Sequence, residues 1–420
     1  MKKYDSYKDS GFDWLGNTPT HWEVLRMCYV FRPISIKNTS GEMNLSVYRD
    51  YGVIPTNSRS DNHNVISEDT SNYKLVEKGD FVMNKMKCWM GSLGLSDYRG
   101  IVSPSYTVMK PLKNNSHKYI HYLLRSKTYI PQYKRLSYGV REGQWDLRFE
   151  DFKELPCLIP SLSEQQQIVS FLDTKTSLID SLIEKTQRKI ELLKEKRTSL
   201  INEVVTKGLN PNVEMKDSGV EWIGEIPSHW GLSKLGFLSK PVQGIQVDVE
   251  NQLYNQHEGS ERFIRISDYT MEEEPRYIDS YPESSIVNEE DLVMVRYGSK
   301  SGKVYSGIKG VICNNVFRIE HNEKLYTKFL SYFLNQESFY NQIEMSRDNN
   351  TLPQVSHGLY KEMKITLPVI LEQHQIVEYL DEQTQIIDNT ISIEEKRIEL
   401  LKEYRQSLIS EVVTGKRKVV

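Results

Sequence analysis

The sequence has no long apolar run and few cysteines. None of its 420 residues belong to a stretch of about 18 apolar residues, the length of a membrane-spanning helix, and the mean hydropathy is −0.55. Cys28, Cys88, Cys157 and Cys313 lie far apart and form no Cys-x-x-Cys pair, so neither a zinc site nor a disulfide framework is expected. The N-terminal MKKYDSYKDS lacks the apolar core of a secretory signal. We therefore expect a cytoplasmic protein in a reducing compartment.

An excess of positive charge is also missing. Lys and Arg number 54 against 57 Asp and Glu, a formal net charge of −3. This balance argues against a protein coated in cations, as a nonspecific DNA-binding protein would be. It does not exclude DNA as a ligand, because an acidic helical region can offset basic loops in the total.

Motifs of nucleotide-dependent and methyl-transferring enzymes are absent. Residues 298–304 (GSKSGKV) resemble a phosphate loop, but only three residues separate the glycines, and Val304 stands where Ser or Thr would hold Mg²⁺. No Asn-Pro-Pro-Tyr or Asp-Pro-Pro-Tyr phrase occurs, such as methyltransferases use on a flipped adenine. His21 and His229 each precede a tryptophan without a nearby second ligand, so we interpret them as packed structural residues. We expect no catalytic residue and no metal site in this chain.

Two phrases occur twice, each time at an offset of 208 residues. Residues 9–22 (DSGFDWLGNTPTHW) return as residues 217–230 (DSGVEWIGEIPSHW). Residues 164–206 align without a gap on residues 372–414, with 25 identities in 43 positions. The chain is therefore two copies of one unit.

The stretches between the repeated phrases, residues 23–160 and 231–368, have similar lengths but much weaker similarity. Short β-branched runs bounded by Gly, Asn, Asp and Ser predict strands in both. Residues 119–125 and 326–334 predict short amphipathic helices. Each stretch is therefore predicted to be a mixed α/β domain.

The repeated 43-residue segments carry a sustained heptad pattern. In the first copy, positions a are Thr176, Ile183, Ile190, Arg197 and Val204, and positions d are Leu172, Ile179, Thr186, Leu193 and Leu200. In the second copy, positions a are Thr384, Ile391, Ile398, Arg405 and Val412, and positions d are Leu380, Ile387, Glu394, Leu401 and Leu408. Neither segment contains Pro or Gly, so each is predicted to be a helix of about 65 Å. Because each apolar seam needs a partner, we expect the two helices to pair with each other, and a two-fold relation between the repeats makes that pairing antiparallel.

The predicted fold class is α+β, with two mixed α/β domains separated by two long antiparallel coiled-coil helices and an internal pseudo-two-fold repeat. The domains are assigned to residues 1–160 and 209–368, and the helical spacers to residues 161–208 and 369–420. Two different globular domains on two matching long helices are typical of a protein whose helices hold the domains at a fixed separation.

The repeated phrases resemble those of the specificity subunit of type I restriction-modification systems, over essentially the whole chain. The phrases are Asp-Ser-Gly-x-x-Trp-x-Gly-x-x-Pro-x-His-Trp, and Glu-Gln-x-x-Ile-Val-x-[Phe/Tyr]-Leu-Asp running to Glu-Leu-Leu-Lys-Glu, each present twice. The resemblance implies a non-catalytic subunit whose two target recognition domains each read half of a split, asymmetric site on double-stranded DNA. It also implies that the helices set the gap between the half-sites and bind two modification subunits.

The same resemblance implies where the chemistry of the complex lies. Modification subunits carry S-adenosylmethionine and methylate adenine, and added restriction subunits cut unmethylated DNA using ATP and Mg²⁺. No cofactor is expected in this chain, and no membrane partner.

Side chains suited to DNA occur at corresponding places in the two domains. Arg, Gln and Asn form two-pronged hydrogen bonds with guanine or adenine edges, and Lys binds phosphate. The predicted DNA contacts are Lys85, Lys87, Trp89, Arg135, Tyr138, Arg141, Gln144 and Trp145 in the first domain, and Arg296, Tyr297, Ser299, Lys300, Lys303, Arg347, Asn349, Asn350 and Gln354 in the second. For an individual residue, an ordinary mixed surface loop remains the alternative.

Two other functions stay open from the residues alone. A free-standing coiled-coil protein would have no sequence-specific DNA affinity and no methyltransferase partner. A self-sufficient restriction enzyme would need about 400 further residues for its catalytic domains. The two divergent domains count against the first, and the missing motifs count against the second.

Overall fold

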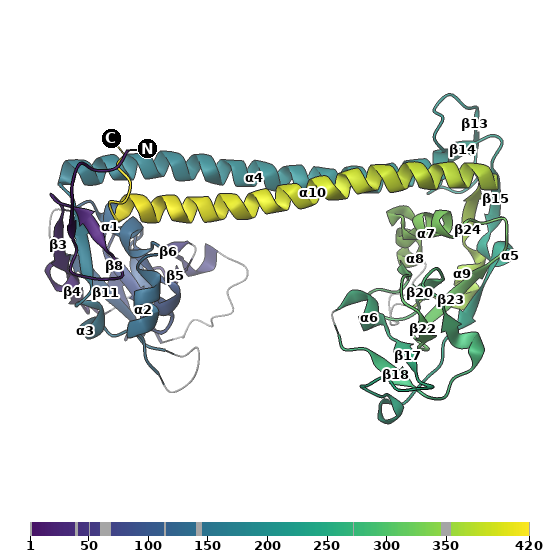
Figure 1. The fold of residues 1–420 in the computed structure, drawn as a ribbon, viewed down its shortest axis with the longest axis horizontal. Coiled ribbons are helices and arrows are strands. Elements are labelled where there is room, and N and C mark those ends of the chain that lie inside the picture. The colour runs from purple at the N-terminus through teal and green to yellow at the C-terminus, as the bar shows by residue number, and fades with distance from the viewer. Residues whose placement is uncertain are drawn as a thin grey trace. The chain divides into compact units, whose positions relative to one another are not determined.

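The computed structural model describes residues 2–37, 41–49, 51–58, 69–112, 115–139, 145–271, 273–345 and 354–419. The chain forms two compact units (Figure 1). Unit 1 contains Met1–Gln187 and Lys396–Val420, and unit 2 contains Arg188–Glu395. Each unit therefore holds one globular domain together with part of each of two long helices, α4 (Leu162–Lys207) and α10 (Ile370–Val413).

The globular domain of unit 1 is built from short strands and helices. Its strands are β1 Tyr7–Asp9, β2 Asn17–Pro19, β3 Glu23–Arg26, β4 Phe31–Ile34, β5 Leu45–Tyr48, β6 Gly52–Pro55, β7 Lys74–Val76, β8 Phe81–Asn84, β9 Leu93–Leu95, β10 Gly100–Val102, β11 Tyr106–Pro111 and β12 Pro156–Ile159. Its helices are α1 His117–Leu124, α2 Ile130–Leu136 and α3 Phe149–Phe152, with the 3-10 turns η1 Met27–Tyr29, η2 Thr56–Ser58 and η3 Lys85–Met90. The largest described sheet has the strand order β4-β11-β8-β9 and is antiparallel throughout.

The globular domain of unit 2 repeats this plan. Its strands are β13 Met215–Asp217, β14 Glu225–Pro227, β15 Gly231–Lys234, β16 Ser239–Gln243, β17 Glu261–Ile264, β18 Arg276–Ile278, β19 Ile286–Val287, β20 Leu292–Val295, β21 Val304–Tyr305, β22 Gly310–Ile312, β23 Val316–His321 and β24 Lys364–Leu367. Its helices are α5 Leu235–Leu238, α6 Ile266–Thr270, α7 Thr327–Asn335, α8 Glu337–Met345 and α9 His357–Glu362, with η4 Val249–Asn251 and η5 Glu283–Ser285. The sheet order β16-β23-β20-β21 matches that of unit 1, and a second sheet has the order β18-β17-β22-β19.

The predicted mixed α/β domains and their short helices are confirmed. The helix predicted at residues 119–125 corresponds to α1, and the one predicted at 326–334 corresponds to α7. Both are amphipathic because their apolar residues recur every three or four positions, and that face packs into the core of its unit.

The two long helices pair antiparallel within each unit. In unit 1, Arg405 of α10 donates two hydrogen bonds to Asp180 of α4, at 2.9 and 3.2 Å. In unit 2, the Nε of Arg197 lies 3.0 Å from the Oδ1 of Asp388. These are the same pair at the repeat offset of 208, with the roles of the helices exchanged. The expected antiparallel coiled coil is therefore present in both units.

The heptad positions face the seam between the helices. All ten a and d residues of each helix are buried or half-buried, including Arg197 and Arg405. Glu394 is a buried carboxylate at a d position, and its Oε1 lies 2.6 Å from the Nζ of Lys189. A glycine in the left-handed conformation follows each helix within two residues, Gly208 with φ 76° and Gly415 with φ 73°, and an L-residue adopts this conformation only with strain.

The repeated Trp and Glu-Gln phrases mount each globular domain on its helix. Glu164, near the start of α4, accepts a 3.1 Å bond from the indole of Trp22, and Glu372 accepts a 2.9 Å bond from Trp230. Both indoles are buried. The equivalent histidines also reach these carboxylates, at 2.9 Å for His21 and 3.2 Å for His229.

This geometry corrects the interpretation of the two histidines. His21 and His229 lie at the junction of domain and helix, but about half of each side chain is exposed, so neither is the packed residue that the sequence predicted. The packed residue of each pair is the tryptophan. Each histidine has a single carboxylate partner, and no cluster of three metal-binding side chains occurs in the described part of the chain.

The glutamine that follows each anchoring glutamate is buried and forms hydrogen bonds with the backbone of the globular domain. Gln165 is buried, accepts a 2.8 Å bond from the backbone N–H of Ser116, and donates to the carbonyl of Pro160. Gln373 repeats both contacts in unit 2, with Tyr326 and Pro368. The repeated sequence is therefore the part of the chain that attaches two divergent domains to their helices in the same way.

The chain ends close to where it begins. The backbone N–H of Lys418 donates a 3.0 Å bond to the carbonyl of Lys2. A side chain at Gly415 would meet Pro19 at 2.3 Å, so the end of α10 lies directly against the first Trp phrase. Among the described residues, no helix combines the length and apolarity needed to cross a membrane.

Candidate nucleic-acid interface

In unit 1, the structure brings together candidate residues from two separate segments. Lys85, Lys87 and Trp89 lie on η3, which ends at Gly91 in the left-handed conformation. The backbone N–H of Leu147 donates a 3.1 Å bond to the carbonyl of Lys85, which joins η3 to the segment after α2.

Aromatic rings form the contact between these two segments. The rings of Trp89 and Trp145 are 5.3 Å apart, and the ammonium of Lys134 lies 5.7 Å from the Trp145 ring. The exposed Tyr138 pairs with Asp146 through the backbone. The two indoles are half-buried, and cations beside partly exposed aromatic rings are a combination that suits both phosphate and base contact.

Arg135 lies at the C-terminal end of α2, where its Nε donates a 2.9 Å bond to Gln132. Arg141 and Gln144 lie outside the described residues, as do Arg347, Asn349 and Asn350 of the second domain. Their role in DNA contact stays a prediction.

In unit 2, the equivalent segments meet through the same backbone bond. The N–H of Val355 donates a 2.8 Å bond to the carbonyl of Arg296, and Tyr297 forms a β-bridge with Gln354. The guanidinium of Arg296 lies 4.8 Å from the ring of Tyr297 and donates a 2.7 Å bond to Gln243. Arg296 is therefore held in place before any ligand arrives.

The Gly-rich segment after β20 is a tight turn. Gly298 and Gly302 have φ of 90° and 91°, and Ser299 and Lys300 are exposed at its tip. The ammonium of Lys303 lies 4.3 Å from the ring of Tyr340 on α8. The segment lies between β20 and β21 and does not lead into a helix, as a phosphate loop does.

Several polar residues near Arg296 were not predicted from the sequence. Gln243, Gln246, Asn314 and Asn315 lie around the end of β20, because Arg296 donates its backbone N–H to Asn315 and Asn314 donates to Gln246. The density of Asn and Gln around residues 243–256 was the signal that could have found Gln243 and Gln246, whereas Asn314 and Asn315 lie outside that segment.

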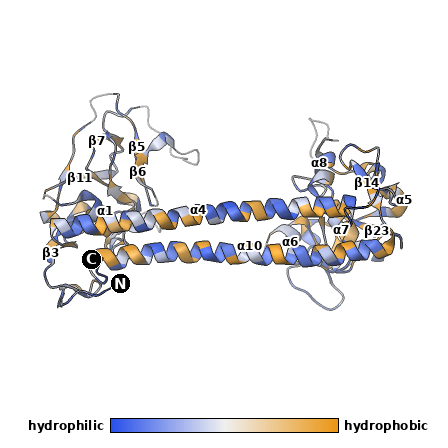
Figure 2. Ribbon diagram, turned by 90° about the horizontal axis from the view of Figure 1, so that it is seen from above, coloured by the Kyte–Doolittle hydropathy of each residue, from blue (hydrophilic) through white to orange (hydrophobic). Residues whose placement is uncertain are grey.

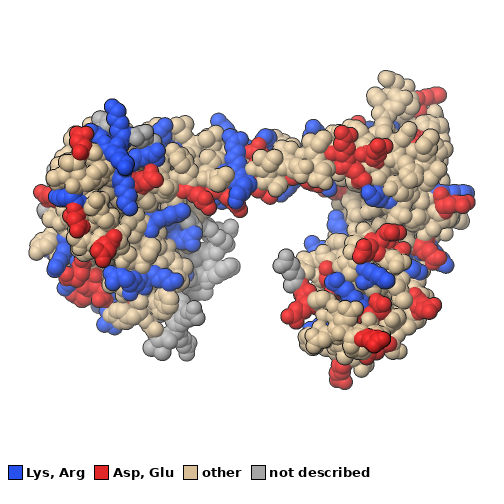
Figure 3. Space-filling model, viewed as in Figure 1, with Lys and Arg blue, Asp and Glu red and all other residues tan. Residues whose placement is uncertain are grey.

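On the face drawn in Figure 3, the described charged side chains of neither unit form one broad basic patch. Lys and Arg alternate there with Asp and Glu over both units. This agrees with the net charge of −3 and favours local contacts made by individual loops.

An apolar stripe lies on the outside of the paired helices. Figure 2 shows hydrophobic residues recurring along α4 and α10. The exposed ones at heptad positions c and g are Leu178, Leu182 and Leu192 of α4, and Tyr379, Ile386, Ile393, Leu400 and Tyr404 of α10. Positions g of two antiparallel helices face each other and c lies next to g, so within each unit these side chains share one face of the helix pair.

The stripe is repeated between the units. Leu178 of unit 1 corresponds to Ile386 of unit 2, and Leu400 of unit 1 corresponds to Leu192 of unit 2, both at the offset of 208. A coiled coil usually carries polar residues at c, so exposed apolar residues at this position are unusual.

The structure thus shows two divergent domains attached in the same way to two repeated helices. The family "Type I restriction modification DNA specificity domain" matches residues 21–192 and 255–403, which is more than half of the chain. The chain belongs to this family.

Curated relatives extend the match along the whole chain. The type I restriction enzyme MjaVIII specificity subunit of Methanocaldococcus jannaschii is 24% identical over 444 residues, which cover 98% of this chain and 97% of the relative. The StySPI specificity subunit of Salmonella potsdam is 25% identical over 325 residues, covering 73% of this chain and 67% of the relative.

Solved structures share the fold. The HsdS subunit from Thermoanaerobacter tengcongensis aligns with a TM-score of 0.59 at 15% identity, over 95% of this chain and 98% of its own. A chain from a study of complex assembly and conformational transition of the type I R-M system aligns with a TM-score of 0.73 at 15% identity, over 94% of this chain and 98% of its own.

Proposed function

We propose that this chain reads a bipartite, asymmetric DNA site and positions modification and restriction subunits on it. The single observation that supports this most is the repeated mounting of two domains whose candidate DNA-contact residues differ. Lys85 and Lys87 stand in the first domain where Arg296 stands in the second, on the same structural frame. Two different sets of donors and acceptors suit two different half-sites.

The apolar stripe is the proposed dock for the modification subunits. Because Leu178 and Leu400 in unit 1 have Ile386 and Leu192 as counterparts in unit 2, two copies of one partner find similar surfaces. An amphipathic helix of the partner suits such a stripe, since it buries its own apolar face there.

The chain is proposed to have no catalytic role of its own. S-adenosylmethionine, ATP and Mg²⁺ are assigned to the partner subunits, which perform adenine methylation and ATP-dependent cleavage in the complete complex.

Methylome sequencing tests the DNA function. Cells lacking other modification systems carry this chain together with its modification subunit, and the control cells carry the modification subunit alone. We expect methylated adenines in one split motif only when this chain is present. Methylation at the same sites without this chain would contradict the proposal.

Stoichiometry tests the dock. Leu178→Glu and Ile386→Glu place a charge at equivalent points of the stripe, and each single variant is expected to bind one modification subunit instead of two. The double variant is expected to bind none. Gln385→Glu, on the opposite side of α10 at heptad position b, is the control that should still bind two. Two bound copies on the double variant would rule out the stripe as the dock.

A further inference from the structure

A small groove in unit 2 has four side-chain amides among its ten lining residues, beside the apolar Val247, Phe263, Ile266 and Cys313. It has a volume of about 340 Å³ (lined by Gln246, Gln252, Asn314 and Asn315, with Arg265 on the opposite wall). We call these residues the amide groove. It lies between the segment after β16, the start of α6 and the turn that joins β22 to β23.

The amide groove is built rigidly. Gln243 donates a 2.6 Å bond to the carbonyl of Asn314, and the backbone N–H of Ile245 donates a 2.9 Å bond to Ile312. A side chain at Gly244 would lie 2.1 Å from the carbonyl of Cys313, so only glycine allows the two segments to approach this closely. Because these contacts already fix the backbone of the groove wall, ordering it on ligand binding would cost little free energy.

Two of the amides form a pair with free hydrogen-bonding groups. The Nδ2 of Asn314 donates a 3.3 Å bond to the Oε1 of Gln246. In the described part of the chain, the Nε2 of Gln246 and the Oδ1 of Asn314 have no partner. The pair therefore presents one donor and one acceptor, and exchanging nitrogen and oxygen in both amides would leave the same combination.

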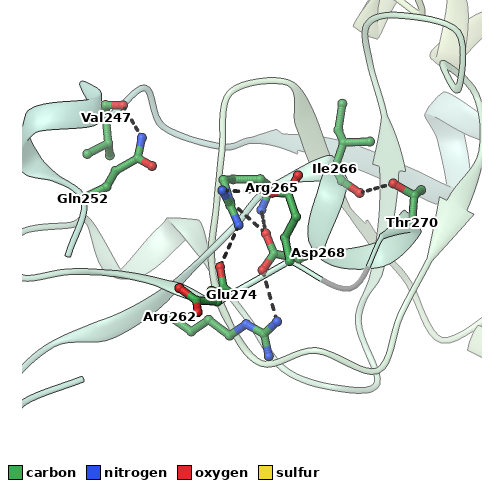
Figure 4. Close-up of polar contacts among 9 residues, drawn as sticks. Val247, Gln252, Arg262, Arg265, Ile266, Asp268, Thr270 and Glu274 are labelled. Carbon is green, nitrogen blue, oxygen red and sulfur yellow. Dashed lines mark hydrogen bonds and ion pairs between the residues drawn. The ribbon is translucent and has the colours of Figure 1, made fainter. Parts of the chain in front are cut away.

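The opposite wall carries a cation whose charge is already compensated. Arg265 donates a 3.0 Å bond to the fully buried carboxylate of Asp268 and a 3.1 Å bond to the carbonyl of Glu274 (Figure 4). A second arginine, Arg262, reaches the other oxygen of Asp268 at 3.1 Å. Glu273 lies 3.3 Å from Arg265 as well. A groove with neutral amides and a neutralised cation suits a neutral ligand better than a phosphate.

We propose that the amide groove reads a base edge of duplex DNA, with Asn314 and Gln246 as specificity-determining residues that favour adenine. Adenine presents an N6 donor beside an N7 acceptor in the major groove, which matches the acceptor and donor of the pair. The inference rests on the proposed function, and it assigns a contact within the half-site of the second domain.

The first domain differs at the corresponding place. Its turn after β10 contains Ser103 and Ser105, and the ammonium of Lys74 donates to the carbonyls of Pro104 and Tyr106, at 3.1 and 2.6 Å. In unit 1 a lysine therefore lies against the turn that corresponds to the Asn314 turn of unit 2. The two domains are expected to differ in base preference at this point of their half-sites.

Methylome sequencing of Asn314→Ala and Gln246→Ala variants, each with the modification subunit, tests the inference. Asn389→Ala, on the outer side of α10, is the matched control. We expect discrimination for adenine at one position of the second half-motif to fall by about 5- to 150-fold, with the first half-motif unchanged.

The outcomes separate the two proposals. If the unmodified chain directs no sequence-specific methylation, the proposed function fails. If it does, and both variants keep the full motif, the amide groove is not a reading site. An equal decrease at all sites without a change of motif would also overturn the inference. Gln246 is exposed, so Gln246→Ala decides even if Asn314→Ala does not fold.

Discussion

At the residue scale, the carboxylates of Glu164 and Glu372 show how a repeated sequence becomes a repeated contact. Each accepts a bond from a buried indole and from a half-exposed imidazole 143 residues away in the chain. Without the acceptor, the indole N–H of Trp22 or Trp230 would be buried without a partner. A buried donor left in this state is more costly than the bond is favourable.

Glu164→Ala should therefore lower the free energy of unfolding by about 1–3 kcal/mol. Equilibrium urea unfolding measures the change, and Glu372→Ala is the matched variant that should lose a similar amount. Glu164→Gln keeps an acceptor oxygen and should lose less. Equal losses for the Ala and Gln variants would show that the charge, and not the indole hydrogen bond, is the source of the stability.

His121 gives the first domain a pH-dependent stability. Its Nδ1 accepts a 3.1 Å bond from the backbone N–H of Leu95. Burial, reinforced by the charges of Arg125 and Lys118, lowers the pKa of His121 from 6.5 to about 3. As pH falls, His121 is therefore protonated in the unfolded chain before it is protonated in the folded chain. The free energy of unfolding decreases as pH falls from about 6.5 towards 3.

We expect this loss to reach about 1.4 kcal/mol per pH unit once the unfolded histidine is protonated. His121→Asn retains an acceptor for the Leu95 N–H but cannot titrate. Between pH 6.5 and 5, before most carboxylates titrate, its unfolding free energy should vary less with pH than that of the unmodified chain. An unchanged slope in the variant would contradict the assignment.

At the element scale, the sequence pattern predicted the long helices but not the hydrogen bonds, such as that of Gln165, that attach the domains to them. Heptad positions such as Leu172 and Ile190 depend only on local spacing, which the sequence displays directly. Gln165 binds Ser116 across 49 residues, and Asn314 meets Gln246 across 68. Contacts between segments so far apart depend on the tertiary fold, so neither the anchors nor the amide groove can be derived from periodicity.

The helices are also expected to act as a ruler for the DNA site. Four residues lengthen a helix by about 6 Å and rotate its two ends relative to each other by about 40°. One to two base-pair steps give a comparable rise, and each rotates DNA by roughly 35°. A four-residue insertion in a coiled coil is accommodated by local unwinding.

The antiparallel pairing decides where such an insertion must go. Asp180–Arg405 and Arg197–Asp388 stay in register only if α4 and α10 are lengthened together, after residues 187 and 395. The double insertion should leave both half-motifs unchanged and lengthen the unread spacer by one or two base pairs, as measured by methylome sequencing. An active variant that methylates the motif with the original spacer would show that the helices bind partner subunits but do not set the spacer length.

At the scale of the whole molecule, the chain closes on itself in unit 1. Because Lys418 bonds to Lys2 and Gly415 packs against Pro19, the termini lie close together. A circular permutant that joins Val420 to Met1 through a short linker, and opens the chain near residue 210, should fold and bind its modification subunits. Size-exclusion chromatography with the partner checks this, and a folded permutant that binds none would count against the role given to the closed junction.

The whole-molecule claim is that each domain reads its own half of the site. Exchange of residues 209–368 for the corresponding domain of a relative with a known methylated motif, followed by methylome sequencing, tests it most directly. The account predicts that one half of the motif changes to that of the donor while the other half stays as it was. A motif that changes in both halves, or in neither while the hybrid is active, would contradict it.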